Sequence, residues 1–246
     1  MDTSICAETV YTTGHGDAEI EMYVARPQSD ERRGGMVFIH HLPGYDRETK
    51  EFVRRFAVMG FNAVCPNLYT RIAPGASYDD AAAAARAQGG VPDEQVVGDV
   101  GGAMAWLRAL SNSNGKVATI GHCSGGRHSF LVSTHLDPAA AIVCYGGLIV
   151  GETPPQLPTM VPLVDRSPLV SCPILGLFGN DDQFPTPEQV DELEKTLQSN
   201  GKDVEFHRYD GAGHAFFGPD RPAYRVEAAL DGWARIQTFL DKHLAG

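Results

Sequence analysis

The stretch Val117-Ala118-Thr119-Ile120-Gly121-His122-Cys123-Ser124-Gly125 decides the fold of this chain. An apolar, strand-like run leads into a glycine–X–nucleophile–X–glycine pattern, and a helix-like segment follows it. This order is typical of a nucleophile elbow, with cysteine in place of the more usual serine. Glycines at positions 121 and 125 avoid side-chain collisions in so sharp a turn and let the central residue hold a strained backbone. The pattern therefore predicts that Cys123 stands at the first turn of a helix, whose N–H groups and dipole favour a thiolate.

Strand-like and helix-like segments alternate along almost the whole chain. Strands are expected at residues 36–39, 61–65, 117–120, 140–145, 174–178 and 204–209, with amphipathic helices between them and a last helix at about 226–240. Repeated β-then-α units predict a mostly parallel sheet covered by helices on both faces. The polar, alternating segment Ile20–Ala25 predicts an exposed edge strand. No linker or repeat divides the chain, so we expect one α/β domain over residues 1–246, with Thr70–Gly90 and Gly151–Ser167 as excursions near a pocket.

Charge and cysteine usage narrow the class of protein. The formal net charge of −11 argues against a nucleic-acid partner, because such proteins use basic surface to release counterions. Five cysteines without paired spacing indicate free thiols in a reducing compartment, and those at 65, 144 and 172 lie in apolar runs where burial is expected. The sequence shows neither a signal-peptide pattern nor an apolar stretch long enough to span a membrane. We therefore expect a cytoplasmic protein without a membrane partner, either a monomer or a homodimer.

Two later loops supply partners for a cysteine nucleophile. Hydrolases with such an elbow place the acid and then the histidine on loops after later strands. The expected strand ending at Phe178 runs into Gly179-Asn180-Asp181-Asp182, and either aspartate could serve as the acid. The strand at 204–209 runs into Gly213-His214-Ala215, where small neighbours leave room for the imidazole to reach across. The order of the three residues therefore predicts a nucleophile, acid and base of one catalytic site.

An oxyanion hole needs two backbone donors beside the nucleophile. The first is expected from the N–H of Ser124 and the second from the loop His40-His41-Leu42-Pro43-Gly44 after the first central strand. Pro43 has no N–H, so Leu42 is the predicted second donor. The adjacent histidines 40 and 41 would point apart on an extended segment and no third ligand is evident, so we predict no metal.

Taken together, the chain resembles the dienelactone hydrolase family, a branch of the α/β-hydrolases with a Cys-Asp-His triad. The resemblance covers nearly the whole chain and rests on segments 63–69, 121–126, 144–147, 179–182 and 213–216. The family's acid ends a G-x-x-D motif, which selects Asp182 over Asp181, and its histidine matches His214. The resemblance implies an α/β-hydrolase fold and hydrolysis of small cyclic or activated esters without metal or organic cofactor.

Two positions depart from the family's pattern. Its best-known members hold the resting thiol with a glutamate, and His41 stands at the matching position. They also grip a substrate carboxylate with arginines, one of them four residues after the histidine, where this chain has Gly218. Arg86 is the candidate for the other. Three further arginines could contact an anion, although solvated surface positions are the expected outcome: Arg71, Arg127 and Arg221.

The sequence therefore predicts a cysteine-dependent hydrolase of small esters or lactones. His214, oriented by Asp182, takes the proton of Cys123, and an acyl-thioester forms before water releases the acid. His41 is expected either in the substrate pocket or packed under its loop, and Tyr145 either in the pocket or as a strand-end aromatic, whereas His122 packs beneath the elbow. The alternatives are a thioesterase or broad carboxylesterase and, from another class, a non-catalytic binding protein of the same fold.

Overall fold

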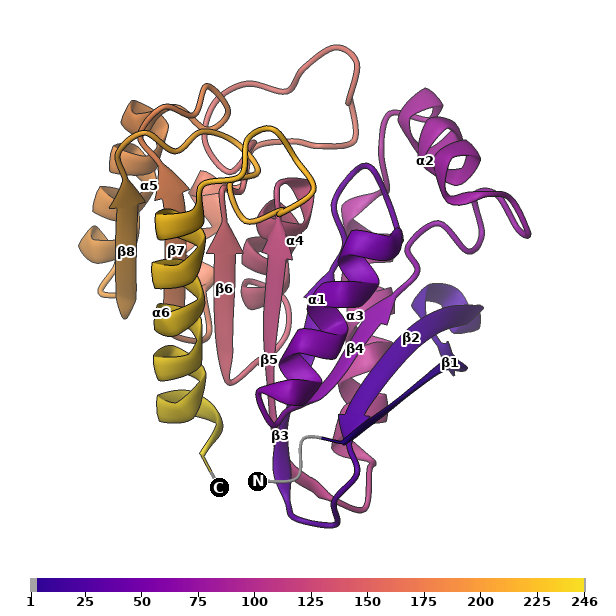
Figure 1. Cartoon of the computed structure of the whole chain (residues 1–246). Coiled ribbons are helices and arrows are strands. Elements are labelled where there is room, and N and C mark those ends of the chain that lie inside the picture. Colours follow the sequence, from indigo (N-terminus) through magenta and orange to yellow (C-terminus); the bar gives the residue numbers. More distant parts are fainter. Residues whose placement is uncertain (1–3, 246) are drawn as a thin grey trace.

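The computed structural model describes residues 4–245 and is built on one eight-stranded sheet with the order β1-β2-β4-β3-β5-β6-β7-β8 (Figure 1). From β4 to β8 in this order every neighbouring pair is parallel, whereas β1–β2 and β2–β4 are antiparallel. This confirms the mostly parallel sheet. The strands are β1 (Ile5–Thr13), β2 (Glu19–Pro27), β3 (Arg33–Ile39), β4 (Asn62–Pro66), β5 (Ser113–His122), β6 (Ala140–Cys144), β7 (Ile174–Gly179) and β8 (Val204–Tyr209).

Helices cover both faces of the sheet. Apolar side chains of α1 and α6 pack on one face, and those of α3, α4 and α5 pack on the other (Figure 1). Local signals set where two of them begin: the Asp46 carboxylate accepts the N–H of Thr49 at the start of α1, and Thr186 with Gln189 forms a capping box at the start of α5. The helices are α1 (Arg47–Val58), α2 (Tyr78–Ala87), α3 (Asp93–Arg108), α4 (Ser124–Ser133), α5 (Pro187–Ser199) and α6 (Val226–Leu244), with short 3₁₀ turns at His15–Asp17 and Val164–Leu169.

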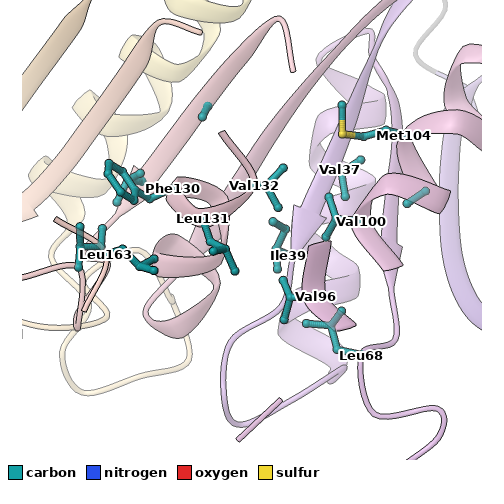
Figure 2. Close-up of a cluster of buried hydrophobic side chains, with 14 of the residues drawn as sticks. Val37, Ile39, Leu68, Val96, Val100, Met104, Phe130, Leu131, Val132 and Leu163 are labelled. Atoms are coloured by element: carbon teal, nitrogen blue, oxygen red, sulfur yellow. The ribbon is translucent and has the colours of Figure 1, made fainter. Parts of the chain in front are cut away.

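The larger cluster of buried side chains lies between the sheet and α3 and α4. Figure 2 shows Val37 and Ile39 of β3 facing Val96, Val100 and Met104 of α3. These three α3 residues recur at helical spacing, which is the pattern that predicted this helix. Because β5 and α4 both pack into this core, the turn between them, which carries Cys123, is held between two rigid elements.

One prediction for the N-terminal half of the fold is wrong. The segment Ile20–Ala25 belongs to β2, which is second from the edge, and β1 covers it. Its alternation has another cause: Met22 and Val24 face the α3 side of the core, while Tyr23 lies under α1 near Arg54. The edge strand β1 was missed because its own side chains are mostly exposed. The excursion Thr70–Gly90 contains a helix, α2. Both excursions lie near a pocket, as predicted, although neither lines the cavity around Cys123 described below.

The sheet brings the predicted site loops to one edge. Because β3, β5, β6, β7 and β8 run parallel, the loops that follow them leave from the same end of the sheet (Figure 1). All five cysteines are free, and those at 65, 144 and 172 are buried, as predicted. Within residues 4–245 no helix combines the length and apolar character that a membrane span needs.

Candidate active site

Cys123 occupies a strained turn between β5 and α4. Its backbone angles are φ 55° and ψ −123°, a conformation that a residue with a side chain adopts at a cost of about 1–3 kcal/mol. A Cβ on Gly121 would collide with the carbonyl of Gly125, and a Cβ on Gly125 would collide with the carbonyl of Ile39. Both flanking glycines are therefore needed for the close approach of α4 to the sheet. The elbow leaves the Cys123 side chain partly exposed.

Asp182 and His214 come together from the loops after β7 and β8. His214 Nδ1 lies 2.9 Å from Asp182 Oδ2, and the other oxygen of Asp182 accepts the N–H of Phe184 at 2.8 Å. Asp182 is 2 % exposed, whereas Asp181 faces solvent. The structure thus places Asp182, not Asp181, beside the imidazole. The catalytic roles of these residues stay predictions.

The surroundings of His214 favour its protonated form. Burial lowers the pKa of His214, but the Asp182 hydrogen bond and the interaction with the Cys123 sulfur outweigh burial and raise this pKa to about 10. The imidazole of His214 is therefore protonated at neutral pH. Because Asp182 holds Nδ1, the remaining nitrogen, Nε2, is the one free to face the sulfur.

The predicted oxyanion donors are both free of other partners. Within the described residues, no acceptor engages the N–H of Leu42 or of Ser124, although the neighbouring N–H of Cys123 donates to Cys144. His40 fixes the loop of residues 40–44 from below. Its Nε2 accepts the N–H of Leu68 at 3.1 Å and its Nδ1 donates to the carbonyl of residue 41 at 2.9 Å. Burial lowers the pKa of His40 to about 4, so this histidine is neutral and structural.

A small cavity of about 90 Å³, called the thiol cavity below, is lined by Cys123 and His214. His41 and Tyr145 both line it, which places them where the sequence analysis expected, while their contact with substrate stays a prediction. Glu48 and Arg221 also line it, and neither was predicted there. The full lining is His41, Pro43, Glu48, His122, Cys123, Tyr145, His214, Ala215, Gly218 and Arg221.

Tyr145 packs against the imidazole of His214. Its ring packs edge-on against His214, with ring centres 5.1 Å apart, and its hydroxyl lies 3.0 Å from His122 Nδ1. Burial lowers the pKa of His122 well below its usual value, so His122 is neutral. As expected, His122 packs beneath the elbow, where aromatic rings including that of Phe52 surround it.

A His41–Asp46 hydrogen bond and a Glu48–Arg221 ion pair lie beside the thiol cavity, next to α1. His41 Nε2 lies 3.1 Å from Asp46 Oδ2, and Arg221 donates to Glu48 Oε2 through Nε at 2.7 Å and Nη2 at 2.5 Å. A Cβ on Gly218 would run into Glu48 Oε1. The absence of a side chain at position 218 thus makes room for the Glu48 carboxylate. A glycine where the family has an arginine was the sequence signal that another side chain could fill this space.

The arginine expectations need correction. Arg221 lines the cavity and is not a freely solvated surface residue. Arg127 is fully buried and pairs with Asp93 at 2.7 Å, so it holds α4 to α3. Arg71 pairs with the buried Asp99 at 2.5 Å.

His41, Asp46 and Glu48 also offer three ligand atoms within 4.8 Å of one another. The Arg221 guanidinium already pairs with the Glu48 carboxylate of this cluster. That the site works without a metal stays a prediction.

Comparisons with known proteins agree with this geometry. The model of the dienelactone hydrolase family matches residues 20–244. A Yersinia pestis protein named "Putative carboxymethylenebutenolidase" is 31% identical over 97% of this chain and 88% of its own, and an Escherichia coli K12 protein of the same name is 30% identical over 98% and 89%. The crystal structure of a "Putative Dienelactone Hydrolase" from Klebsiella pneumoniae superposes with a TM-score of 0.84 at 26% identity, covering 97% of this chain and 99% of that chain.

A family match over most of the chain, relatives of nearly equal length and the shared sheet lead to one conclusion. The chain belongs to the dienelactone hydrolase family and is a carboxylic ester hydrolase with an α/β-hydrolase fold.

Proposed function

We propose that this protein hydrolyses small esters or lactones through an acyl-thioester on Cys123. The observation that carries the proposal is the line of groups from Asp182 to His214, 2.9 Å apart, and on to Cys123, which lines the same small cavity as His214 at the end of a strained elbow. Such a line is the nucleophile, base and orienting acid that covalent hydrolysis needs.

The proposed reaction has two steps, acylation of Cys123 and hydrolysis of the acyl-thioester. The Cys123 thiolate attacks the ester carbonyl, and the negative oxygen of the tetrahedral intermediate accepts the N–H groups of Leu42 and Ser124. The C–O bond breaks as His214 gives its proton to the departing alkoxide, which leaves an acyl-thioester. His214 then takes a proton from water, the resulting hydroxide attacks the thioester, and the carboxylic acid and thiol are released.

A thiolate favours a particular class of ester. Because sulfur is itself a good leaving group, the tetrahedral intermediate returns to reactants unless the alcohol leaves at least as easily. Aryl esters and enol lactones meet this condition, whereas amides do not. The proposal therefore commits to activated esters and lactones, with a thioesterase or broad carboxylesterase as the rival enzyme.

The test is a substrate panel combined with trapping of the intermediate. Purified protein is assayed with lactones, nitrophenyl esters and an acyl thioester, and the acid-quenched reaction is digested for mass spectrometry. We expect hydrolysis of the activated esters and an acyl group on the peptide containing Cys123. Turnover of the thioester alone would support the rival enzyme, and no turnover of any substrate would support a binding protein.

Alkylation gives an independent check of the nucleophile. Burial raises the pKa of Cys65, Cys144 and Cys172, which makes these thiols poor competitors for iodoacetamide. Cys6 is partly exposed, so the experiment uses a Cys6→Ser variant. We expect loss of hydrolysis to track labelling of Cys123, and an inactivated protein with unlabelled Cys123 would contradict the assignment. The absence of nucleic-acid, membrane and metal partners, the oligomeric state and the cytoplasmic location stay predictions.

A further inference from the structure

The thiol cavity is too small for an activated ester. Its volume is about 90 Å³, whereas sites for organic ligands usually measure about 300–1,000 Å³. The cavity can hold the reacting carbonyl and its nearest atoms. The remainder of the substrate must therefore lie in an adjoining space.

A groove of about 900 Å³ adjoins the thiol cavity and is called the outer groove here. It runs between α1, the loop of residues 217–224 and Trp233 of α6. Glu48 and Arg221 line both spaces, so their ion pair forms the side wall where the two spaces meet. Both Arg221 donors converge on Oε2 of Glu48, and Oε1 has no partner among the described residues. The wall is thus held through one oxygen.

The outer groove has an aromatic floor and balanced charge. Trp233 packs with Phe52 and Phe217 at ring-centre distances of 5.7 and 5.6 Å. Four arginines along the groove are matched by four carboxylates, and two of these pairs, Arg221–Glu48 and Arg54–Glu51, are in direct contact. The rings are largely buried and the Arg55 guanidinium lies 3.8 Å over the centre of the Trp233 ring, so the groove presents this planar group to a flat aryl ring and offers no net charge to an anion.

The direction of the groove identifies which part of the substrate it receives. His214 must protonate the departing oxygen, so the alcohol part lies on the His214 side of the sulfur. The chain that follows His214 lines the thiol cavity with Gly218 and the outer groove with Phe217 and Tyr224. Resting on the function proposed above, we infer that the outer groove is the subsite for an aryl leaving group, with the Glu48–Arg221 pair as the size-determining wall.

The test compares phenyl acetate with 2-naphthyl acetate. Their leaving groups have similar acidity but differ in apolar area, so the ratio of kcat/KM reports the subsite and not the chemistry. We expect a ratio of about five to ten in favour of the naphthyl ester. Tyr224→Ala should bring the ratio to within about twofold of one, while Tyr11→Ala, the same change at an exposed tyrosine of β1, should leave it at the wild-type value. Glu48→Ala removes the wall and should raise the ratio further.

A binding measurement separates this inference from the proposed function. The chain has two tryptophans, so Trp106→Phe leaves Trp233 of the groove floor as the single reporter. We expect saturable quenching of its fluorescence by 2-naphthol, weakened at least about fivefold by Tyr224→Ala. Quenching without hydrolysis of either ester would uphold the groove and refute the proposed function. Hydrolysis with a ratio near one, or without saturable quenching, would overturn the groove and leave the proposed function intact.

Discussion

Two histidine–aspartate pairs flank Cys123, one from each half of the chain, and they differ in which nitrogen is held. His214 binds Asp182 through Nδ1, the nitrogen near its backbone, so Nε2 at the far end faces the sulfur. His41 binds Asp46 through Nε2, which leaves only Nδ1 free. The first imidazole extends toward the nucleophile, and the second is tied back to the start of α1.

The two aspartates differ as well. Asp182 is 2 % exposed and gives its second oxygen to the N–H of Phe184. Asp46 is a quarter exposed in its side chain and caps α1 through Thr49. Burial raises the pKa of Asp46, but the hydrogen bonds from His41 and Thr49 outweigh it and lower this pKa to about 2. The same pair of residue types thus lies beside Cys123 in one loop and caps a helix in the other.

Replacement of His214 should have the largest effect. His214→Gln removes the base and the proton donor, so turnover of an aryl ester should fall by at least about 10⁴-fold. His41→Gln, the matched change in the second pair, should keep at least about a fifth of the wild-type kcat/KM. Comparable losses in the two variants, with unchanged circular dichroism, would show that both imidazoles act on the substrate.

The acid of the first pair should come next. Asp182→Asn keeps the loop but turns His214 to the wrong tautomer, so turnover should fall by about 10³-fold. Asp181→Asn is the control because that side chain faces solvent, and it should stay within about twofold of wild type. Equal losses of turnover in the two variants would contradict the assignment of Asp182 as the residue that orients the imidazole.

A pH series should reveal the stability that protonated His214 contributes. The folded pKa of about 10 exceeds the unfolded value of about 6.5. The contribution is therefore complete below about pH 6.5 and is lost as pH rises toward 10. We expect the free energy of unfolding of wild type, relative to His214→Gln, to fall across this window in urea titrations. A constant difference from pH 6.5 to 10 would mean that folding does not raise this pKa.

The sequence predicted those parts of the site that depend on local pattern. Cys123 and the aspartates 181 and 182 follow buried apolar strands, His214 follows the more polar β8, and a parallel sheet brings such loops to one edge. The pairing of Glu48 with Arg221 was missed because the two residues lie 173 positions apart and meet only through the fold. Strand β1 was missed because an edge strand buries little of its side-chain surface. Exposure of an edge strand and contacts between residues far apart in the chain produce no periodic pattern in the local sequence, so neither could be predicted.

The smallest effect should come from His41 itself. A proton on this imidazole favours a neighbouring thiolate, but its Nε2 is held by Asp46, so it acts on Cys123 only through the field inside the thiol cavity. In the Cys6→Ser background, His41→Gln should slow alkylation of Cys123 by iodoacetamide about two- to fivefold. The exposed loop residue His15, changed to Gln, is the matched control and should have no effect. Equal alkylation rates for His41→Gln and wild type would show that His41 only holds the start of α1. The His214–Asp182 pair would then act on Cys123, and the His41–Asp46 pair would be purely structural.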